Sequence, residues 1–188
     1  EKGECLERIK SDLKKLEIVP DIISYSSDHF PKLRELMTTL IKEGNAYCDN
    51  IEPEKMKEER MNGIKSAKRD TSVEENLKIW EEMQGDNPSP EIKKYCIRGK
   101  IDYQNANKCL RDPVFYRFTE EKHDRCPENY HLFPTYDFAC PCIDSIEGIT
   151  HAMRANEYSD RIAMYEWVQK VLKLRKVNIY EFSRLNLI

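Results

Sequence analysis

Glycine is scarce in this chain, at 6 of 188 residues. Loops that cradle phosphates with their backbone amides need closely spaced glycines, and the sequence has neither a G-x-G-x-x-G segment nor a Walker loop. It also has no G-x-S-x-G segment, and its four histidines lack the H-E-x-x-H spacing. The usual local signatures of nucleotide-binding proteins, serine hydrolases and zinc peptidases are therefore absent.

Closely paired cysteines are also rare. The seven cysteines are irregularly spaced and form no C-x-x-C segment, and only Cys140 and Cys142 lie close together. A secreted disulfide scaffold is typically shorter and richer in cysteine, and tetrahedral zinc sites usually draw on two close ligand pairs. We therefore expect reduced, mostly buried thiols and no metal site, with a redox or zinc protein as a third-ranked alternative.

Neither sign of charge dominates, because 31 Lys and Arg residues stand against 34 Asp and Glu residues and the formal net charge is -3. Attraction to nucleic acid through bulk charge is thus excluded, although a local basic patch is not. No apolar run approaches the ~20 residues needed to span a bilayer, and no signal peptide opens the chain. We expect a cytoplasmic protein without a membrane partner, and the missing initial Met suggests a processed chain or a fragment.

The first 44 residues predict a helix, a strand and a second helix. Apolar residues recur three and four apart over residues 6–16, and residues 21–25 have strand character. A second amphipathic stretch over residues 33–41 ends at Gly44. This order is typical of α/β proteins.

From residue 46 the pattern changes to a mixture of helices and antiparallel strands, and the last third returns to α/β order. A capping box from Ser72 to Glu75 opens one of the helices. The elements expected in the middle are strands at 46–48, 95–101 and 114–118 and helices at 54–60 and from 72 to 83. Those expected at the end are strands at 132–133, 149–153 and 177–182 and helices at 143–147 and 160–174.

Several longer strings are more specific than these patterns. They are RDTSVEENL at 69–77, RGKID at 98–102, RDPVFYR at 111–117, FPTYDFACP at 133–141, DSIEGITH at 144–151, EYSDR at 157–161 and YEFSRLNL at 180–187. In this order and spacing they resemble the catalytic domain of class I glutamyl- and glutaminyl-tRNA synthetases. The resemblance covers essentially the whole chain.

The resemblance implies a class I synthetase nucleotide-binding fold, Rossmann-like and α/β, that is incomplete at its N-terminus. Residues 1–45 would end its first half, residues 46–132 would form an inserted α+β acceptor-stem-binding domain, and residues 133–188 would supply its second half. The two loops that handle the ATP phosphates in this family would lie before Glu1 and after Ile188. The chain would then hold no catalytic residue of its own and, as a fragment, would be inactive alone.

Two positions favour the glutamyl over the glutaminyl branch. Glutaminyl enzymes carry a Thr-His pair where this chain has Ala139 and Cys140, and a Cys where it has Arg154. A substrate with a second carboxylate calls for an additional cation, and arginine offers a fixed, two-pronged donor. The pattern therefore resembles glutamyl-tRNA synthetases of the eukaryotic and archaeal type, with a glutaminyl enzyme as the alternative within the class.

The resemblance also implies roles for individual residues. Tyr136 and Arg154 would bind glutamate, while Glu157, Arg184 and Leu185 would bind ATP, which enters with Mg²⁺. By residue type alone, Tyr136 is better interpreted as a core tyrosine, and the alternative for Arg154 is a surface ion pair.

The RNA contacts implied are those of the tRNA(Glu) acceptor stem. Asp160 would approach the minor groove, where guanine shows the only donor. The basic run of Lys65, Lys68 and Arg69 would touch phosphates, although such a run is usually a solvated loop. An alternative from another class is a non-catalytic tRNA-binding module on the same scaffold. Partners in a multi-synthetase assembly would bind through regions outside this chain.

Overall fold

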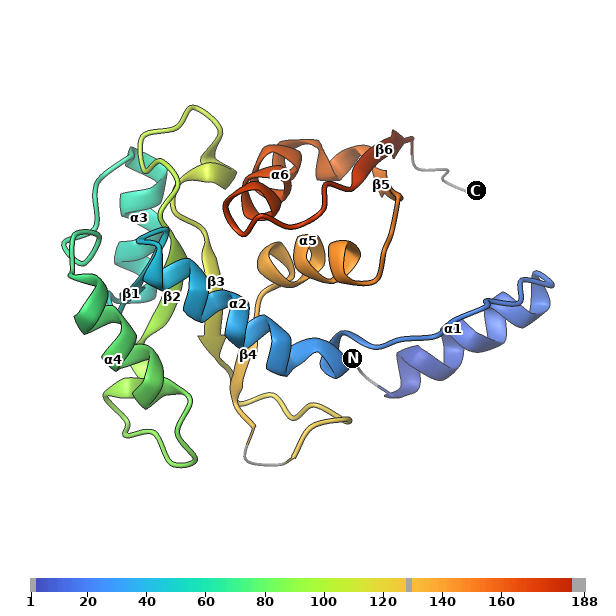
Figure 1. Cartoon of the computed structure of the whole chain (residues 1–188), viewed down its shortest axis with the longest axis horizontal. Coiled ribbons are helices and arrows are strands. Elements are labelled where there is room, and N and C mark those ends of the chain that lie inside the picture. The colour runs from blue at the N-terminus through green and yellow to red at the C-terminus, as the bar shows by residue number, and fades with distance from the viewer. Residues whose placement is uncertain (1–2, 128–129, 184–188) are drawn as a thin grey trace.

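The computed structural model describes residues 3–127 and 130–183, which fold into two adjoining layers of sheet and helix (Figure 1). The α-helices are α1 (Gly3–Lys15), α2 (Phe30–Lys42), α3 (Pro53–Asn62), α4 (Val73–Met83), α5 (Tyr136–Ile146) and α6 (Ile162–Val171). The strands are β1 (Ala46–Asp49), β2 (Cys96–Gly99), β3 (Val114–Phe118), β4 (Leu132–Pro134), β5 (His151–Ala155) and β6 (Asn178–Phe182). Short 3-10 helices are η1 (Ser26–His29), η2 (Ile92–Lys94), η3 (Lys108–Leu110) and η4 (Asn156–Arg161).

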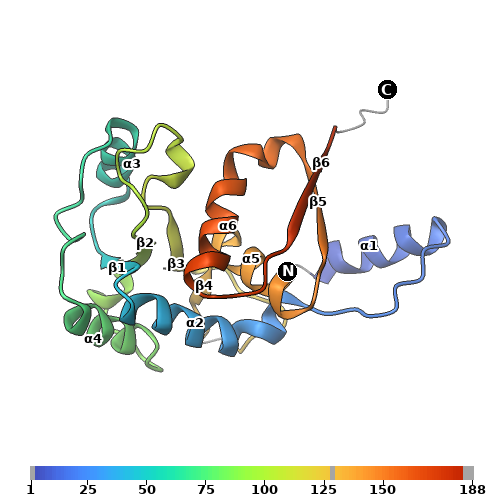
Figure 2. The ribbon, with the colours of Figure 1, turned by 45° about the horizontal axis from the view of Figure 1, so that its top comes forward.

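The larger sheet is antiparallel throughout, in the order β1-β2-β3-β4. The helices α2 and α4 pack against each other and against β1, while α5 packs against β3. Gly99 at the end of β2 lies under the Phe115 ring, because a Cβ atom there would come within 2.3 Å of a ring carbon. The smaller sheet pairs β5 and β6 in parallel, with η4 and α6 between them in sequence (Figure 2).

The helix α2 shows why the sequence pattern is reliable here. Its apolar residues Leu33, Met37 and Leu40 are fully buried, and the chain leaves the helix through Gly44 at φ +74°, a conformation that favours glycine. The helix α4 begins at Ser72, whose Oγ accepts a hydrogen bond from the Glu75 amide at 3.2 Å. Both helix ends were predicted from sequence and are confirmed.

Aromatic side chains join the larger sheet and α5 in the main apolar core, while a smaller cluster is formed by Cys140, Ala152, Tyr165 and Val177. Trp80 of α4 meets Tyr116 of β3 edge-on at 5.1 Å between ring centroids, and Phe115 packs on Phe138 of α5 at 5.4 Å. Phe138 also lies 5.7 Å from the Tyr116 ring, and Phe115 and Tyr116 are both fully buried. The helix α5 is thereby held against the sheet.

The strand predicted at 21–25 is wrong. These residues have no strand partner in the described part of the chain, and the side chains of Ile22 and Ile23 are 84% and 56% exposed. Extended backbone needs a ladder of hydrogen bonds to become a stable strand. The helix α1 that precedes them lies far from α3 and α4 at the opposite side of the molecule (Figures 1 and 2).

Three predicted boundaries near the C-terminal end are also wrong. The helix expected at 143–147 begins already at Tyr136 and runs through Pro141, whose carbonyl accepts a hydrogen bond from buried Gln169 of α6 at 3.0 Å. The strand expected at 149–153 is β5, shifted two residues onward. The helix expected from 160 starts as the 3-10 turn η4 and becomes α-helical only at Ile162.

Candidate functional site

Side chains from the start of α5, the strand β5 and the turn η4 meet around Arg154, at a site that we call the pocket. Tyr136 is the first residue of α5 and is 59% exposed, and its ring meets Tyr158 of η4 edge-on at 6.2 Å. The guanidinium carbon of Arg154, on β5, lies 5.5 Å from the centroid of the Tyr158 ring. The structure therefore brings Tyr136 and Arg154 to one place, around Tyr158, which the sequence argument did not name.

Arg154 is anchored from behind by α5. Its Nη2 atom lies 2.7 Å from Asp144 Oδ2 and 2.6 Å from the Cys140 sulfur. The hydroxyl of Tyr165, on α6, donates to the same Asp144 oxygen at 2.9 Å. Among the described residues, the Arg154 Nε and the Tyr158 hydroxyl are buried without a hydrogen-bond partner. Unpaired buried polar atoms are uncommon in folded proteins, and a bound ligand or water is one explanation for them.

Burial keeps the other titratable groups of the pocket neutral. Partial burial, with the adjacent Cys140 thiol, raises the pKa of Tyr136 to about 12. Burial, with the neighbouring Asp144 carboxylate, raises the pKa of Cys140 to about 11. At neutral pH the Arg154–Asp144 pair therefore supplies the ionic charge of the pocket, and the tyrosines offer hydroxyls and ring faces.

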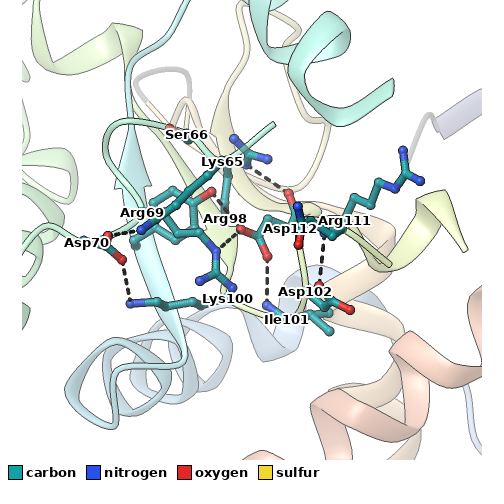
Figure 3. Close-up of polar contacts among 12 residues, drawn as sticks. Lys65, Ser66, Arg69, Asp70, Arg98, Lys100, Ile101, Asp102, Arg111 and Asp112 are labelled. Atoms are coloured by element: carbon teal, nitrogen blue, oxygen red, sulfur yellow. Dashed lines mark hydrogen bonds and ion pairs between the residues drawn. The ribbon is translucent and has the colours of Figure 1, made fainter. Parts of the chain in front are cut away.

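The basic run lies in the loop between α3 and α4, where Arg69 takes part in a buried network (Figure 3). Arg69 Nε pairs with Asp112 Oδ2 at 2.6 Å, and Lys65 forms an ion pair with Asp70. Asp112 is fully buried and also accepts hydrogen bonds from the Tyr47 hydroxyl and from a backbone amide. Of the run, only Lys68 has no side-chain ion pair with a described residue. An RNA contact of Lys65, Lys68 and Arg69 stays a prediction.

The network explains why three of the sequence strings are so specific. Arg98 is 2% exposed, donates to Asp49 Oδ2 at 2.8 Å, and donates through Nε to the Asp112 carbonyl at 2.9 Å. Ser66 donates to the same Asp49 oxygen at 2.9 Å. The segments 69–77, 98–102 and 111–117 thus meet through charged side chains buried in the middle of the chain. A buried charge needs such partners, and loss of one partner is strongly destabilising.

A groove of about 730 Å³ lies between α3 and the sheet, and it reaches Thr135 beside the pocket. Apolar side chains including Met56, Tyr95 and Phe118 line it. Its charged lining residues are six cations and one carboxylate: Lys57, Arg60, Lys93, Lys94, Lys108, Arg117 and Glu52. Two of these cations already have partners within the protein: Lys94 pairs with Glu91, and Arg60 donates a hydrogen bond to the Arg111 carbonyl. The groove combines positive charge with aromatic and aliphatic surface.

Comparison with known proteins identifies the family. The family model described as tRNA synthetases class I (E and Q), catalytic domain, matches residues 1–188. The chain belongs to this family. The expected fold class is thereby confirmed.

The relatives of this synthetase domain are glutamate–tRNA ligases. It is 50% identical over 189 residues to the cytoplasmic glutamate–tRNA ligase of Saccharomyces cerevisiae, covering 100% of this chain and 26% of that protein. It is 46% identical over 179 residues to the bifunctional glutamate/proline–tRNA ligase of Drosophila melanogaster, covering 95% of this chain and 10% of the relative. The chain thus spans about a quarter of the length of the cytoplasmic ligases.

A solved structure shares the fold. The crystal structure of a glutamate tRNA ligase from Elizabethkingia meningosepticum in complex with its amino acid matches with a TM-score of 0.63 at 19% identity. The match covers 97% of this chain and 40% of that one. At this identity the likeness supports the architecture of the synthetase domain.

The remaining predicted site residues of the synthetase domain are placed as follows. Glu157 and Asp160 are both exposed on η4, and the Asp160 carbonyl accepts a hydrogen bond from Asn107 Nδ2 at 2.7 Å. This bond ties η4 to the loop before η3 and so connects the pocket with the groove side. Arg184 and Leu185 lie outside the described residues.

The roles of Tyr158, Asp144 and the groove cations as site residues were not predicted from the sequence. Asp144 and Tyr158 stand inside strings that carried the resemblance, but their partners come from other elements and show no local spacing. The groove cations are scattered between residues 57 and 117, so no run of charge reveals them. Among the described residues, no group of three metal-binding side chains forms a metal site, and no helix is long and apolar enough to cross a membrane.

Proposed function

We propose that this chain is the part of a glutamate–tRNA ligase that selects glutamate and receives the acceptor end of tRNA(Glu). In this reaction the α-carboxylate of glutamate attacks the α-phosphorus of ATP and displaces pyrophosphate. The glutamyl group then passes from the adenylate to a hydroxyl of the terminal tRNA ribose, with release of AMP. The names of relatives that are 45–50% identical over the whole chain support this assignment.

The observation that carries the proposal is the single, anchored arginine between two tyrosines. Arg154 is 20% exposed, its Nε and Nη1 donors have no hydrogen-bond partner among the described residues, and Tyr136 and Tyr158 lie beside it. A γ-carboxylate satisfies these donors, whereas a γ-amide would set its own N–H groups against them. The pocket thus favours glutamate over glutamine.

ATP is bound beyond the glutamate pocket in this proposal, as its magnesium complex. Glu157 lies three residues along the chain from Arg154 and is exposed, and we place it near the ribose of ATP or of tRNA. Arg184 and Leu185 follow β6, which pairs directly with β5. Ligands of open α/β sheets bind beyond the carboxyl ends of such strands.

The RNA surface that we propose is the groove between α3 and the sheet. Unpaired nucleotides bind in grooves that combine cations for the phosphates with aromatic side chains for the bases. The groove offers both kinds of group. Its cations include Lys57, Lys108 and Arg117, and its aromatic side chains are Tyr95 and Phe118. Asp160 lies on η4, which adjoins η3 at the groove. The alternative surface for the RNA contact is the basic run of Lys65, Lys68 and Arg69.

In this proposal the segments predicted from the sequence have separate roles. Residues 46–132 bind the acceptor stem, and residues 1–45 and 133–188 belong to the nucleotide-binding fold. We propose a cytoplasmic location, as in the names of the relatives. Any association with other synthetases uses segments outside this chain.

The test is Arg154→Cys in the full-length protein. Loss of a hydrogen-bonded charge in a partly buried site costs on the order of 2–5 kcal/mol, so the KM for glutamate rises tens- to thousands-fold. The KM for ATP changes little. Arg125→Cys is the matched control, because it removes an arginine paired with Asp28 at 2.6 Å in a distant loop. A glutamate KM within about threefold of wild type, ~0.65 kcal/mol, would remove Arg154 from the substrate site.

A further inference from the structure

Asp144 lies directly behind Arg154 and gathers three donors on one oxygen. Its Oδ2 accepts hydrogen bonds from Arg154 Nη2 at 2.7 Å and from the Tyr165 hydroxyl at 2.9 Å. The Cys140 thiol lies 3.5 Å from the same atom. Asp144 is two turns along α5 from Tyr136, and its side chain is 18% exposed.

Counting the donors of Arg154 shows what this contact does. A guanidinium has five N–H donors in one plane. Both hydrogens of Nη2 have acceptors, one at Asp144 and one at Cys140. The Nε hydrogen is buried without a partner among the described residues. The two hydrogens of Nη1 also have no partner among the described residues and, unlike Nε, are not buried, so they are the accessible pair left for a ligand.

We propose that Asp144 is a positioning residue that fixes the Arg154 guanidinium with Nη1 turned toward the substrate carboxylate. Because Asp144 also balances the charge of Arg154, the pocket recognises glutamate through directed N–H groups and not through excess positive charge. Tyr165 holds the Asp144 carboxylate in place from α6. This assignment rests on the proposed role of Arg154 in glutamate binding.

The test compares Asp144→Ala, Asp144→Glu and Asp144→Asn in the full-length enzyme. Removal or displacement of the acceptor frees the guanidinium to rotate, and misplacement of a binding group by about 1 Å costs on the order of a hundredfold. Asp144→Ala and Asp144→Glu should raise the glutamate KM at least about tenfold, with kcat and the ATP KM within about threefold of wild type. Asp144→Asn retains an acceptor oxygen and should stay within about threefold.

Glu147→Ala is the matched control, because Glu147 ends the same helix, pairs with His29 at 2.8 Å and has no contact with Arg154. Thermal unfolding of each variant checks folding, and Asp144→Glu carries the test if Asp144→Ala does not fold. A normal glutamate KM in Asp144→Glu and Asp144→Ala, or equal changes in the glutamate and ATP parameters, would overturn the proposal. An unchanged glutamate KM in Arg154→Ala would instead refute the glutamate-binding role itself.

Discussion

The partner of each arginine, more than its position in sequence, decides what that arginine does. Arg69 and Arg154 were both predicted from the sequence to bind a ligand, Arg69 an RNA phosphate and Arg154 glutamate. Arg69 pairs with Asp112, which is fully buried, whereas Arg154 pairs with Asp144 and keeps donors that have no partner among the described residues. The first arrangement stabilises the fold, and the second leaves donors for a ligand. The sequence shows the charges but not these distances.

Arg69→Met should therefore destabilise the protein much more than Lys65→Met. Removal of one partner of a buried ion pair costs about 3–5 kcal/mol, and Asp112 keeps two other donors, so we expect a loss near ~3 kcal/mol. Lys65 pairs with Asp70, and their side chains are 43% and 60% exposed. Such surface pairs contribute at most about 1 kcal/mol. Urea unfolding of the full-length variants measures both.

Equal, small losses in the two variants would contradict the buried network. A third result is also informative: if Arg69→Met weakens tRNA binding without any loss of stability, then the basic run contacts RNA as the sequence alone suggested.

At the scale of elements, the start of α5 ties the pocket to the large sheet. Thr135 precedes the helix, its amide donates to the Phe115 carbonyl, and its hydroxyl donates to the Val114 carbonyl, both at 2.8 Å. The pocket residue Tyr136 comes next in the chain, and Thr135 also lines the groove. The groove and the pocket thus share one hydrogen-bonded junction, so the proposed RNA and glutamate sites are directly connected.

The two placements of the RNA make different predictions for the salt dependence of tRNA binding. Each phosphate contact contributes about 0.7–0.9 to the slope of log affinity against log salt. The groove double variant Lys57→Ala/Lys108→Ala should flatten the slope by about 1.4–1.8. The matched double variant Lys65→Ala/Lys68→Ala removes the same charge and should leave the slope unchanged. Fluorescence anisotropy across a salt series measures both, and the reverse result would place the RNA on the basic run.

For the whole molecule, sequence patterns located most elements but not the contacts between them. Helices with a buried apolar stripe, such as α2 and α4, were predicted because their periodicity reports burial directly. The strand predicted at residues 21–25 was wrong, because a segment with strand character forms a strand only when a partner strand pairs with it. The start of α5 was not predicted, because proline is unfavourable inside a helix and the sequence does not show the hydrogen bond from Gln169 to the Pro141 carbonyl.

The candidate site was predictable only in part, for the same reason. The strings around Tyr136 and Arg154 pointed to the pocket through resemblance, since the local residues form no independent motif. Asp144 and Tyr158 act on Arg154 through distances across α5, β5 and η4, and the groove cations converge from four separate segments. Contacts of this kind depend on the fold and leave no spacing in the sequence.

The most direct test of the account is the amino-acid selectivity of the full-length protein in tRNA charging. The kcat/KM for attachment to tRNA should be compared for glutamate and glutamine with the wild-type protein. A pocket built around Arg154 that donates to a carboxylate should favour glutamate by at least about a thousandfold. Charging with glutamine at equal or greater kcat/KM, or no charging with either amino acid, would contradict the assignment.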